Sequence, residues 1–211
     1  MSHEYRKDLH HLTWDEVYAR QVQRADLVDA WFDALQLAPG QRVVDLGSGP
    51  GFVSLQAARR VGPTGLVYAI DRSAEALAYL ERIQKEQGIE QIQRIVADAA
   101  TLNAETLRAD AALLTMVLHH ADDPRGLLRT VARILAPGGR VVIAEFHPDG
   151  PCQVGPPRAH RLAPDVVTGW CRKEGLQCIT ERRQTPEHYM LLCGLPASSI
   201  TERDVTALST P

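Results

Sequence analysis

Short apolar runs that alternate with amphipathic segments are the feature that most constrains the fold of this chain. The runs cover residues 42–46, 66–70, 92–97, 111–117 and 140–146. Helical periodicity fills most of the intervals between them. Strands that are apolar on both faces belong to parallel sheets that helices cover on both sides. The chain is therefore predicted to be an α/β protein with a mostly parallel sheet.

The pattern changes after residue 147. A proline-rich loop over 148–157 precedes a helix near 164–174, and two further apolar runs follow at 176–183 and 188–194. The four residues between these runs suffice for a hairpin but not for a crossover helix. We therefore expect seven strands in total, the last two forming a C-terminal antiparallel hairpin.

The length of 211 residues fits one domain with a sizeable core. Its 45% hydrophobic and 23% charged residues argue against disorder. One helix is expected over 14–36, within an N-terminal helical lid segment at 1–37. The main domain is placed at 38–195, and residues 196–211 are predicted to be a flexible tail.

The charge distribution and the apolar runs of the sequence argue against several classes of partner. The net charge is −3 and the basic residues are scattered, which disfavours a nucleic-acid-binding face. No apolar run is long enough for a membrane helix, and the N-terminus lacks an apolar signal-peptide core. A cytoplasmic protein without nucleic-acid or membrane partners is expected.

The cysteines predict no metal site. Cys152, Cys171, Cys178 and Cys193 all lie in the last 60 residues, and no CxxC motif occurs. In a cytoplasmic chain this pattern favours reduced, structural thiols.

Three glycines at alternate positions follow the first apolar run in "RVVDLGSGPGF": Gly47, Gly49 and Gly51. A tight turn without a ligand is one interpretation. A dinucleotide fingerprint needs GxGxxG, and this register fails because Phe52 follows Gly51. A phosphate loop needs a terminal Lys-Ser/Thr pair, which the sequence lacks.

Acidic residues at the ends of the next two runs favour a ligand. Asp71 ends the second run, where a carboxylate can accept both hydroxyls of a ribose. Asp98 ends the third run, where it can accept from an adenine amino group. Each alone fits a helix cap or a solvated strand end. Together with the glycines they mark one edge of a sheet, the edge where open α/β sheets bind ligands.

Five segments in order carry a family resemblance: "VVDLGSGPGF", "VYAIDRS", "IVADA", "MVLHHADDP" and "LAPGGRVVIAEF". They resemble the motifs of class I S-adenosylmethionine-dependent methyltransferases, in particular the group of ubiquinone/menaquinone C-methyltransferases and arsenite methyltransferases. The resemblance covers about residues 14–194. It implies a Rossmann-like seven-stranded sheet, S-adenosylmethionine as cofactor, and methyl transfer to a small-molecule acceptor.

The resemblance also implies cofactor-binding positions. Asp45 and the loop residues Gly47, Ser48 and Gly49 are assigned to the methionine end of the cofactor, and the Met116 backbone to the methionine amine. Asp71 is assigned to the ribose. Asp98 and the Ala99 amide are assigned to the adenine. Arg72 departs from the family pattern, in which an apolar residue often follows the ribose acid. Its guanidinium either stacks on adenine or only its stem packs.

Candidate catalytic residues follow the fourth and fifth runs: His119, His120, Glu145 and His147. Neighbouring strands bring their ends together, so these side chains are expected to wall an acceptor pocket, roofed by residues 5–18. Three roles stay open: a structural or generic family role, acceptor binding or general base catalysis, and a metal site.

The acceptor itself is not identified by the sequence. Two alternative functions remain: a non-catalytic S-adenosylmethionine-binding sensor and an NAD-binding oxidoreductase. The oligomeric state also stays open, with a homodimer among the options.

Overall fold

The computed structural model describes residues 12–102 and 107–196. Its elements, in chain order, are α1 (Trp14–Val22), α2 (Ala25–Leu35), β1 (Arg42–Leu46), α3 (Phe52–Val61), β2 (Leu66–Asp71), α4 (Ala74–Glu86), β3 (Ile92–Val96), β4 (Ala109–Thr115), a 3₁₀ turn (Leu118–His120), α5 (Pro124–Ile134), β5 (Leu135–Phe146), a second 3₁₀ turn (Arg158–His160), α6 (Pro164–Lys173), β6 (Gln177–Arg183) and β7 (His188–Gly194).

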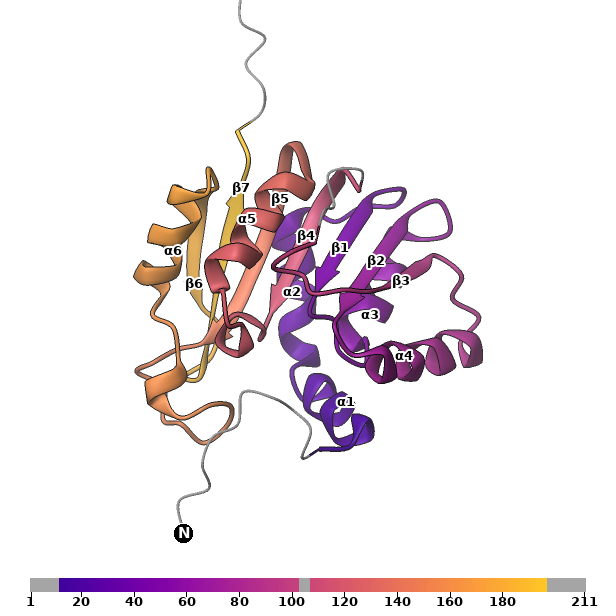
Figure 1. The fold of residues 1–211 in the computed structure, drawn as a ribbon, viewed down its shortest axis with the longest axis horizontal. Coiled ribbons are helices and arrows are strands. Elements are labelled where there is room, and N and C mark those ends of the chain that lie inside the picture. The colour runs from indigo at the N-terminus through magenta and orange to yellow at the C-terminus, as the bar shows by residue number, and fades with distance from the viewer. Residues whose placement is uncertain (1–11, 103–106, 197–211) are drawn as a thin grey trace, which may run out of the picture.

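The seven strands form one sheet in the order β3-β2-β1-β4-β5-β7-β6 (Figure 1). The first five strands are parallel, and β7 is antiparallel to both β5 and β6. The predicted Rossmann-like α/β class and the C-terminal hairpin are therefore confirmed. The strand order reverses between β1 and β4, the point at which such sheets open a crevice for ligands.

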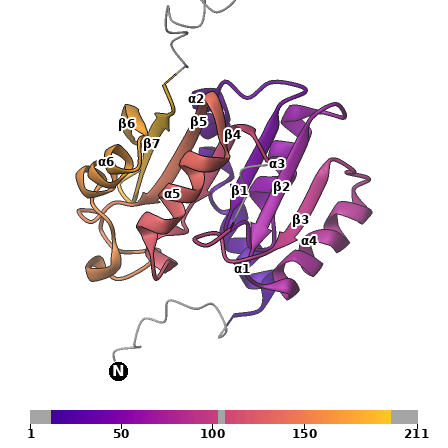
Figure 2. The same ribbon diagram turned by 45° about the horizontal axis from the view of Figure 1, so that its top comes forward.

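Helices cover both faces of the sheet (Figure 2). One core lies between the sheet and α2, α3 and α4, and it contains Trp31, Phe32 and Leu80. The other lies between the sheet and α5 and α6, and it contains Leu128 and Val167. Within the described residues, no helix has the length and apolar character needed to cross a membrane.

The prediction of one helix over 14–36 is wrong, because the helix is interrupted at Gln23 and Arg24. Arg24 has φ −103° and ψ 14°, and α2 begins at the next residue. The break lets two apolar faces pack in different directions. Tyr18 of α1 meets Phe52 of α3 at a ring-centroid distance of 5.8 Å, whereas Trp31 of α2 is buried in the core under the sheet.

Two strand boundaries also differ from the sequence expectation. The fourth strand ends at Thr115 instead of residue 117, because Met116 adopts a left-handed φ of 55°. The fifth strand begins at Leu135, directly after α5, and includes the Pro-Gly-Gly turn residues. Residues 1–11 of the predicted lid and nearly all of the predicted tail lie outside the described residues.

Candidate functional site

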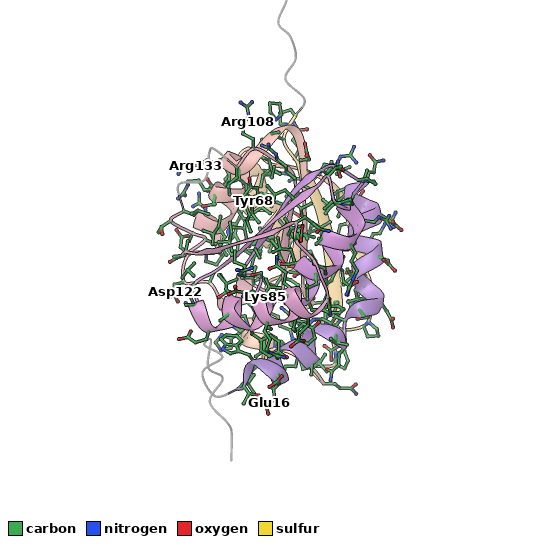
Figure 3. All side chains as sticks on the ribbon, turned by 90° about the vertical axis from the view of Figure 1, so that its right-hand side faces the viewer. Glu16, Tyr68, Lys85, Arg108, Asp122 and Arg133 are labelled. Atoms are coloured by element: carbon green, nitrogen blue, oxygen red, sulfur yellow. The ribbon has the colours of Figure 1, made fainter. Side chains whose placement is uncertain are left out.

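The candidate site lies at the carboxyl edge of the parallel strands. The glycine loop follows β1 there, Asp71 ends β2, and the two histidines follow β4. Figure 3 separates the two edges: Arg108, just before β4, lies at the top, and Asp122, beyond its end, lies in the lower half. Helix α1, marked by Glu16, lies at the lower end, beside this edge.

Packing accounts for two of the three glycines. Gly47, Gly49 and Gly51 have φ values of 73°, 55° and 87°. A Cβ atom on Gly47 would lie 2.3 Å from a methyl of Val117, and one on Gly51 would lie 2.4 Å from a methyl of Leu80. The loop therefore nests against the segment after β4 and against α4. Gly49 differs, because its nearest neighbour is the flexible amide end of a glutamine, at 3.3 Å.

That glutamine, Gln21, ties α1 to the glycine loop. Its Nε2 donates to the Ser48 carbonyl at 3.0 Å, and its Oε1 accepts from the Phe52 backbone N–H at 3.0 Å. The second bond satisfies an N–H at the start of α3 that has no partner within the helix. Sequence reasoning missed Gln21, because a glutamine on an amphipathic helix carries no signal of such a contact.

The first acid of the loop segment is fully buried. Asp45 is 1% exposed and accepts a hydrogen bond from Ser54 Oγ at 2.6 Å. Burial raises the pKa of Asp45 to about 7, although the Ser54 hydrogen bond acts in the opposite direction. The carboxyl contacts α3 within the interior.

Asp71 ties the end of β2 to the glycine loop. Its Oδ2 accepts from the Gly49 N–H at 2.8 Å, and its Oδ1 accepts from the Ser73 N–H at 2.9 Å. A carboxylate oxygen has two acceptor positions, so both oxygens can still accept a hydroxyl. The geometry therefore keeps Asp71 available for a diol.

The other predicted cofactor positions lie nearby at the strand ends. Asp98 is exposed and accepts from the Ala100 N–H at 2.9 Å, and Ala99 is buried. Arg72 is exposed. Met116 donates its N–H to the Ala144 carbonyl at 2.8 Å, and its left-handed backbone is the kind of strain found at functional sites.

These residues fit a cofactor with an amino-acid end and a ribose. Ser48 Oγ is buried and has no hydrogen-bond partner among the described residues, so the loop offers an unused polar group. Asp71 supplies acceptors for hydroxyls. A narrow cavity of about 10 Å³ lies between α1, α2 and the sheet edge, lined by Gln21, Arg24, Trp31, Val53, Thr115 and Met116.

His119 and Glu145 form a buried pair. His119 Nδ1 lies 2.8 Å from Glu145 Oε2, and the His119 backbone N–H donates to Oε1 at 3.3 Å. Their side chains are 3% and 0% exposed. Burial alone would raise the pKa of Glu145, but the His119 charge and hydrogen bonds, with the Phe146 N–H, hold it below its usual value. The pair is therefore a carboxylate-oriented imidazole.

His120 and His147 differ in their contacts. The His120 ring lies 4.1 Å from the His119 ring, centroid to centroid. His147 instead contacts Arg183 and the Asp149 N–H through its Nδ1, at 3.2 and 3.1 Å. The four predicted side chains therefore do not form a single cluster. Within the described part of the chain, their ligand atoms do not form one of the groups that could hold a metal.

Sequence reasoning missed two basic groups beside the pair. Arg24 is half-buried, and burial lowers the pKa of its guanidinium to about 10, with the nearby Glu145 acting against this shift. His188 starts β7, and its ring lies 4.8 Å from that of Phe146. Burial is the main cause that lowers the pKa of His188 to about 4, and the positive charge of Arg24 acts in the same direction. Its Nε2 has no hydrogen-bond partner among the described residues.

Comparison with known proteins adds to this geometry. A family model described as "Methyltransferase domain" matches residues 37–190. The chain belongs to the methyltransferase domain family. The family predicted from the motifs is thereby confirmed, and with it the cofactor class, S-adenosylmethionine.

The matches to individual curated relatives extend over less than half of each relative's length. An arsenite methyltransferase of Halobacterium salinarum is 29% identical over 63% of this chain and 33% of its own. A 2-phytyl-1,4-naphtoquinone methyltransferase of Nostoc punctiforme is 36% identical over 51% and 47%, respectively. The chain thus spans less than half of the length of these curated relatives.

The fold itself matches along nearly the whole described chain. The solved structure of a SAM-dependent methyltransferase from Aquifex aeolicus superposes with a TM-score of 0.78, covering 86% of this chain and 98% of that one. At 18% identity this likeness shows the fold alone. The comparisons support neither the NAD-dependent oxidoreductase nor the sensor alternative.

Proposed function

We propose that this protein transfers a methyl group from S-adenosylmethionine to a small organic molecule with an anionic oxygen near the methylated atom. The observation that carries the first half of this proposal is the bond between Asp71 Oδ2 and the Gly49 N–H, because it sets a diol-binding carboxylate beside the glycine loop. The buried His119–Glu145 pair and the unpaired groups beside it support the second half.

The residues that hold the cofactor in this proposal are those at the carboxyl edge. The Gly47–Gly49 backbone and Ser48 Oγ hold its amino-acid end, and Asp45 lies beneath it. Asp71 takes the ribose hydroxyls, while Asp98 and Ala99 contact the adenine. When bound, the cofactor supplies an electrophilic methyl group on a sulfonium. The protein supplies alignment and the exclusion of water.

His119 is the proposed base for an acceptor that must lose a proton. Its Nδ1 donates to Glu145, so Nε2 is the atom that takes the proton. The Glu145 carboxylate then stabilises the imidazolium and keeps the ring in place, as a carboxylate does in a catalytic triad. The His120 ring, tilted by 41° against that of His119, restricts the approach of the acceptor. His147 has no part in this step, because it is bound to Arg183 and Asp149.

Arg24 and His188 define the acceptor class. A half-buried guanidinium without a hydrogen bond from its side chain to any described residue costs desolvation energy, which an anionic oxygen offsets. The buried Nε2 of His188 offers one further polar contact. Carboxylate, phenolate and enolate oxygens match this combination, whereas a cationic acceptor does not.

The proposal includes a cytoplasmic location and a small-molecule partner, without nucleic acid or membrane. The dispersed charges of the sequence and the absence of a membrane-length apolar run support it.

Calorimetry and a transfer assay test the proposal. S-adenosylmethionine and S-adenosylhomocysteine are expected to bind with micromolar affinity and NAD is not. A tritiated-methyl screen over aromatic and aliphatic acids, phenols and quinols, with neutral and cationic analogues as controls, is expected to label anionic acceptors preferentially. NAD binding without either ligand would overturn the assignment. Cofactor binding without transfer to any acceptor class would favour the sensor function.

A further inference from the structure

Three of the four cysteines meet at one point of the fold. Cys171 lies on α6, Cys178 on β6 and Cys193 on β7. Their Sγ atoms all lie within 4.8 Å of one another. Cys171 and Cys193 are buried and Cys178 is half-buried. We refer to these three residues as the thiol cluster. Its sequence positions, 22 residues apart from first to last, gave no metal-binding spacing.

A β-bulge brings Cys178 to the cluster. Along β6 and β7, Cys178 pairs with Cys193 and Thr180 pairs with Leu192, so two steps on β6 match one step on β7. Without the bulge at Ile179, Cys178 and Thr180 would share a face of the sheet. With it, Cys178 joins Cys193 on the face that α6 covers, and the Ile179 side chain is left 58% exposed.

The cluster is remote from the proposed methyl-transfer site. Cys193 pairs with Val141 of β5, whereas the site residue His188 pairs with Phe146 at the other end of that strand. Five residues of strand correspond to roughly 17 Å. A ligand of the thiols is therefore not the methyl acceptor, and its function is separate from that of the His119–Glu145 pair.

We propose that the thiol cluster binds one thiophilic d¹⁰ cation, such as Zn²⁺ or Cd²⁺, through three sulfur ligands. Thiolate ligands select soft cations, and three cysteines within reach of a single ion supply a trigonal set of them. The half-buried Cys178 leaves the cluster accessible from solvent, so a water can complete a tetrahedral set as the fourth ligand. A cation here joins α6 to both strands of the terminal hairpin.

The thiolate is the form of cysteine that binds a metal, so a cation that enters the thiol cluster displaces the protons that its thiols carry.

The charge of the occupied site is offset by a nearby basic residue. A divalent cation with three thiolates carries a charge of −1, and Arg172 lies close enough to influence the Cys178 sulfur. An isolated negative charge in an apolar surrounding would be costly, and a neighbouring guanidinium reduces that cost.

Cadmium titration of the full-length, reduced protein tests the proposal. We expect a thiolate-to-metal charge-transfer absorption that saturates at one cation per chain, with an intensity for three thiolates and micromolar or tighter affinity. Zn²⁺ should abolish the band by competition. Saturation at another stoichiometry, or a two-thiolate intensity, would overturn the proposal.

Matched cysteine variants locate the site. Cys178→Ser should lower the band intensity by a third and weaken binding at least 100-fold, whereas Cys152→Ser changes an exposed cysteine outside the cluster and should leave both unchanged. If Cys178→Ser does not fold, alkylation of the wild-type protein provides the second measurement. The cation should protect Cys178 and leave Cys152 reactive; protection of neither, or of both equally, excludes the site.

Discussion

His119 Nδ1 lies 2.8 Å from Glu145 Oε2, although 26 residues separate the two in the chain. The contact forms because β4 and β5 are parallel neighbours, so their carboxyl ends coincide. The His119 backbone N–H binds the same carboxylate, which fixes the turn after β4 as well as the ring. The relationship therefore links the position of the proposed base to the register of two strands.

Replacement of Glu145 by glutamine tests this link. Glu145→Gln keeps the size of the side chain but removes the charge that stabilises a protonated His119. We expect turnover to fall at least tenfold, about 1.4 kcal/mol of barrier, while cofactor affinity changes less than twofold. Methyl-transfer kinetics and calorimetry give the two numbers. The exposed Glu90→Gln serves as control, and unchanged turnover in Glu145→Gln would remove the pair from the mechanism.

Arg24 offers a test of acceptor recognition. Arg24→Met should raise the KM for an anionic acceptor at least tenfold with a smaller effect on kcat, because the side chain contributes to binding in the ground and transition states alike. Arg20→Met is the matched control, since Arg20 lies on α1, shortly before Arg24 in the chain, and is exposed. Equal effects of both substitutions on KM would show that only the overall charge matters.

Gly47 is expected to be intolerant of any side chain. Gly47→Ala combines a left-handed φ of 73° with a Cβ placed 2.3 Å from Val117. Gly88→Ala provides the backbone control, because its φ is 64° and the space around its Cβ is open. We expect a loss of about 1 kcal/mol of unfolding free energy in Gly88→Ala, and a further 1–3 kcal/mol in Gly47→Ala. Denaturant unfolding measures both.

The double variant Gly47→Ala with Val117→Ala separates the two causes. It should recover part of the loss, because the shorter side chain at 117 removes the methyl that the new Cβ meets. Without any recovery, the cost at Gly47 would have to come from the backbone alone.

Asp45 predicts an unusual dependence of stability on pH. Its pKa of about 7 in the folded state exceeds the unfolded value of about 3.9, so the folded protein holds the proton more tightly. This contribution is complete below pH 4 and is lost as the pH rises through 7. Asp45→Asn retains an acceptor for Ser54 and cannot ionise. Its stability relative to wild type should therefore rise by a few kcal/mol between pH 4 and pH 8.

Denaturant titrations of the unliganded proteins at several pH values check this prediction. Ser54→Ala removes the hydrogen bond that favours the charged form, so it should raise the folded-state pKa of Asp45 further and extend the loss of stability to higher pH. If the unfolding free energies of wild type and Asp45→Asn differ by the same amount from pH 4 to pH 8, Asp45 is not a buried, protonated acid.

Much of the fold follows from the local pattern of residues. Apolar runs separated by amphipathic helices give a parallel sheet, and a four-residue connection leaves only a hairpin at the end. The glycines and Asp71 could be assigned to one sheet edge, because every parallel strand ends there. The motif order indicated the family for the same reason, since each motif is a strand end with its following turn.

Tertiary packing decided the rest, because contacts between distant residues leave no periodic signal. The split of α1 from α2 depends on where Tyr18 and Trp31 find their partners, and the Gln21 bridge depends on that split. His147 turns to Arg183 only because the hairpin places β6 nearby. A one-residue bulge at Ile179 sets the face of Cys178, and with it the meeting of three thiols that the sequence alone left apart.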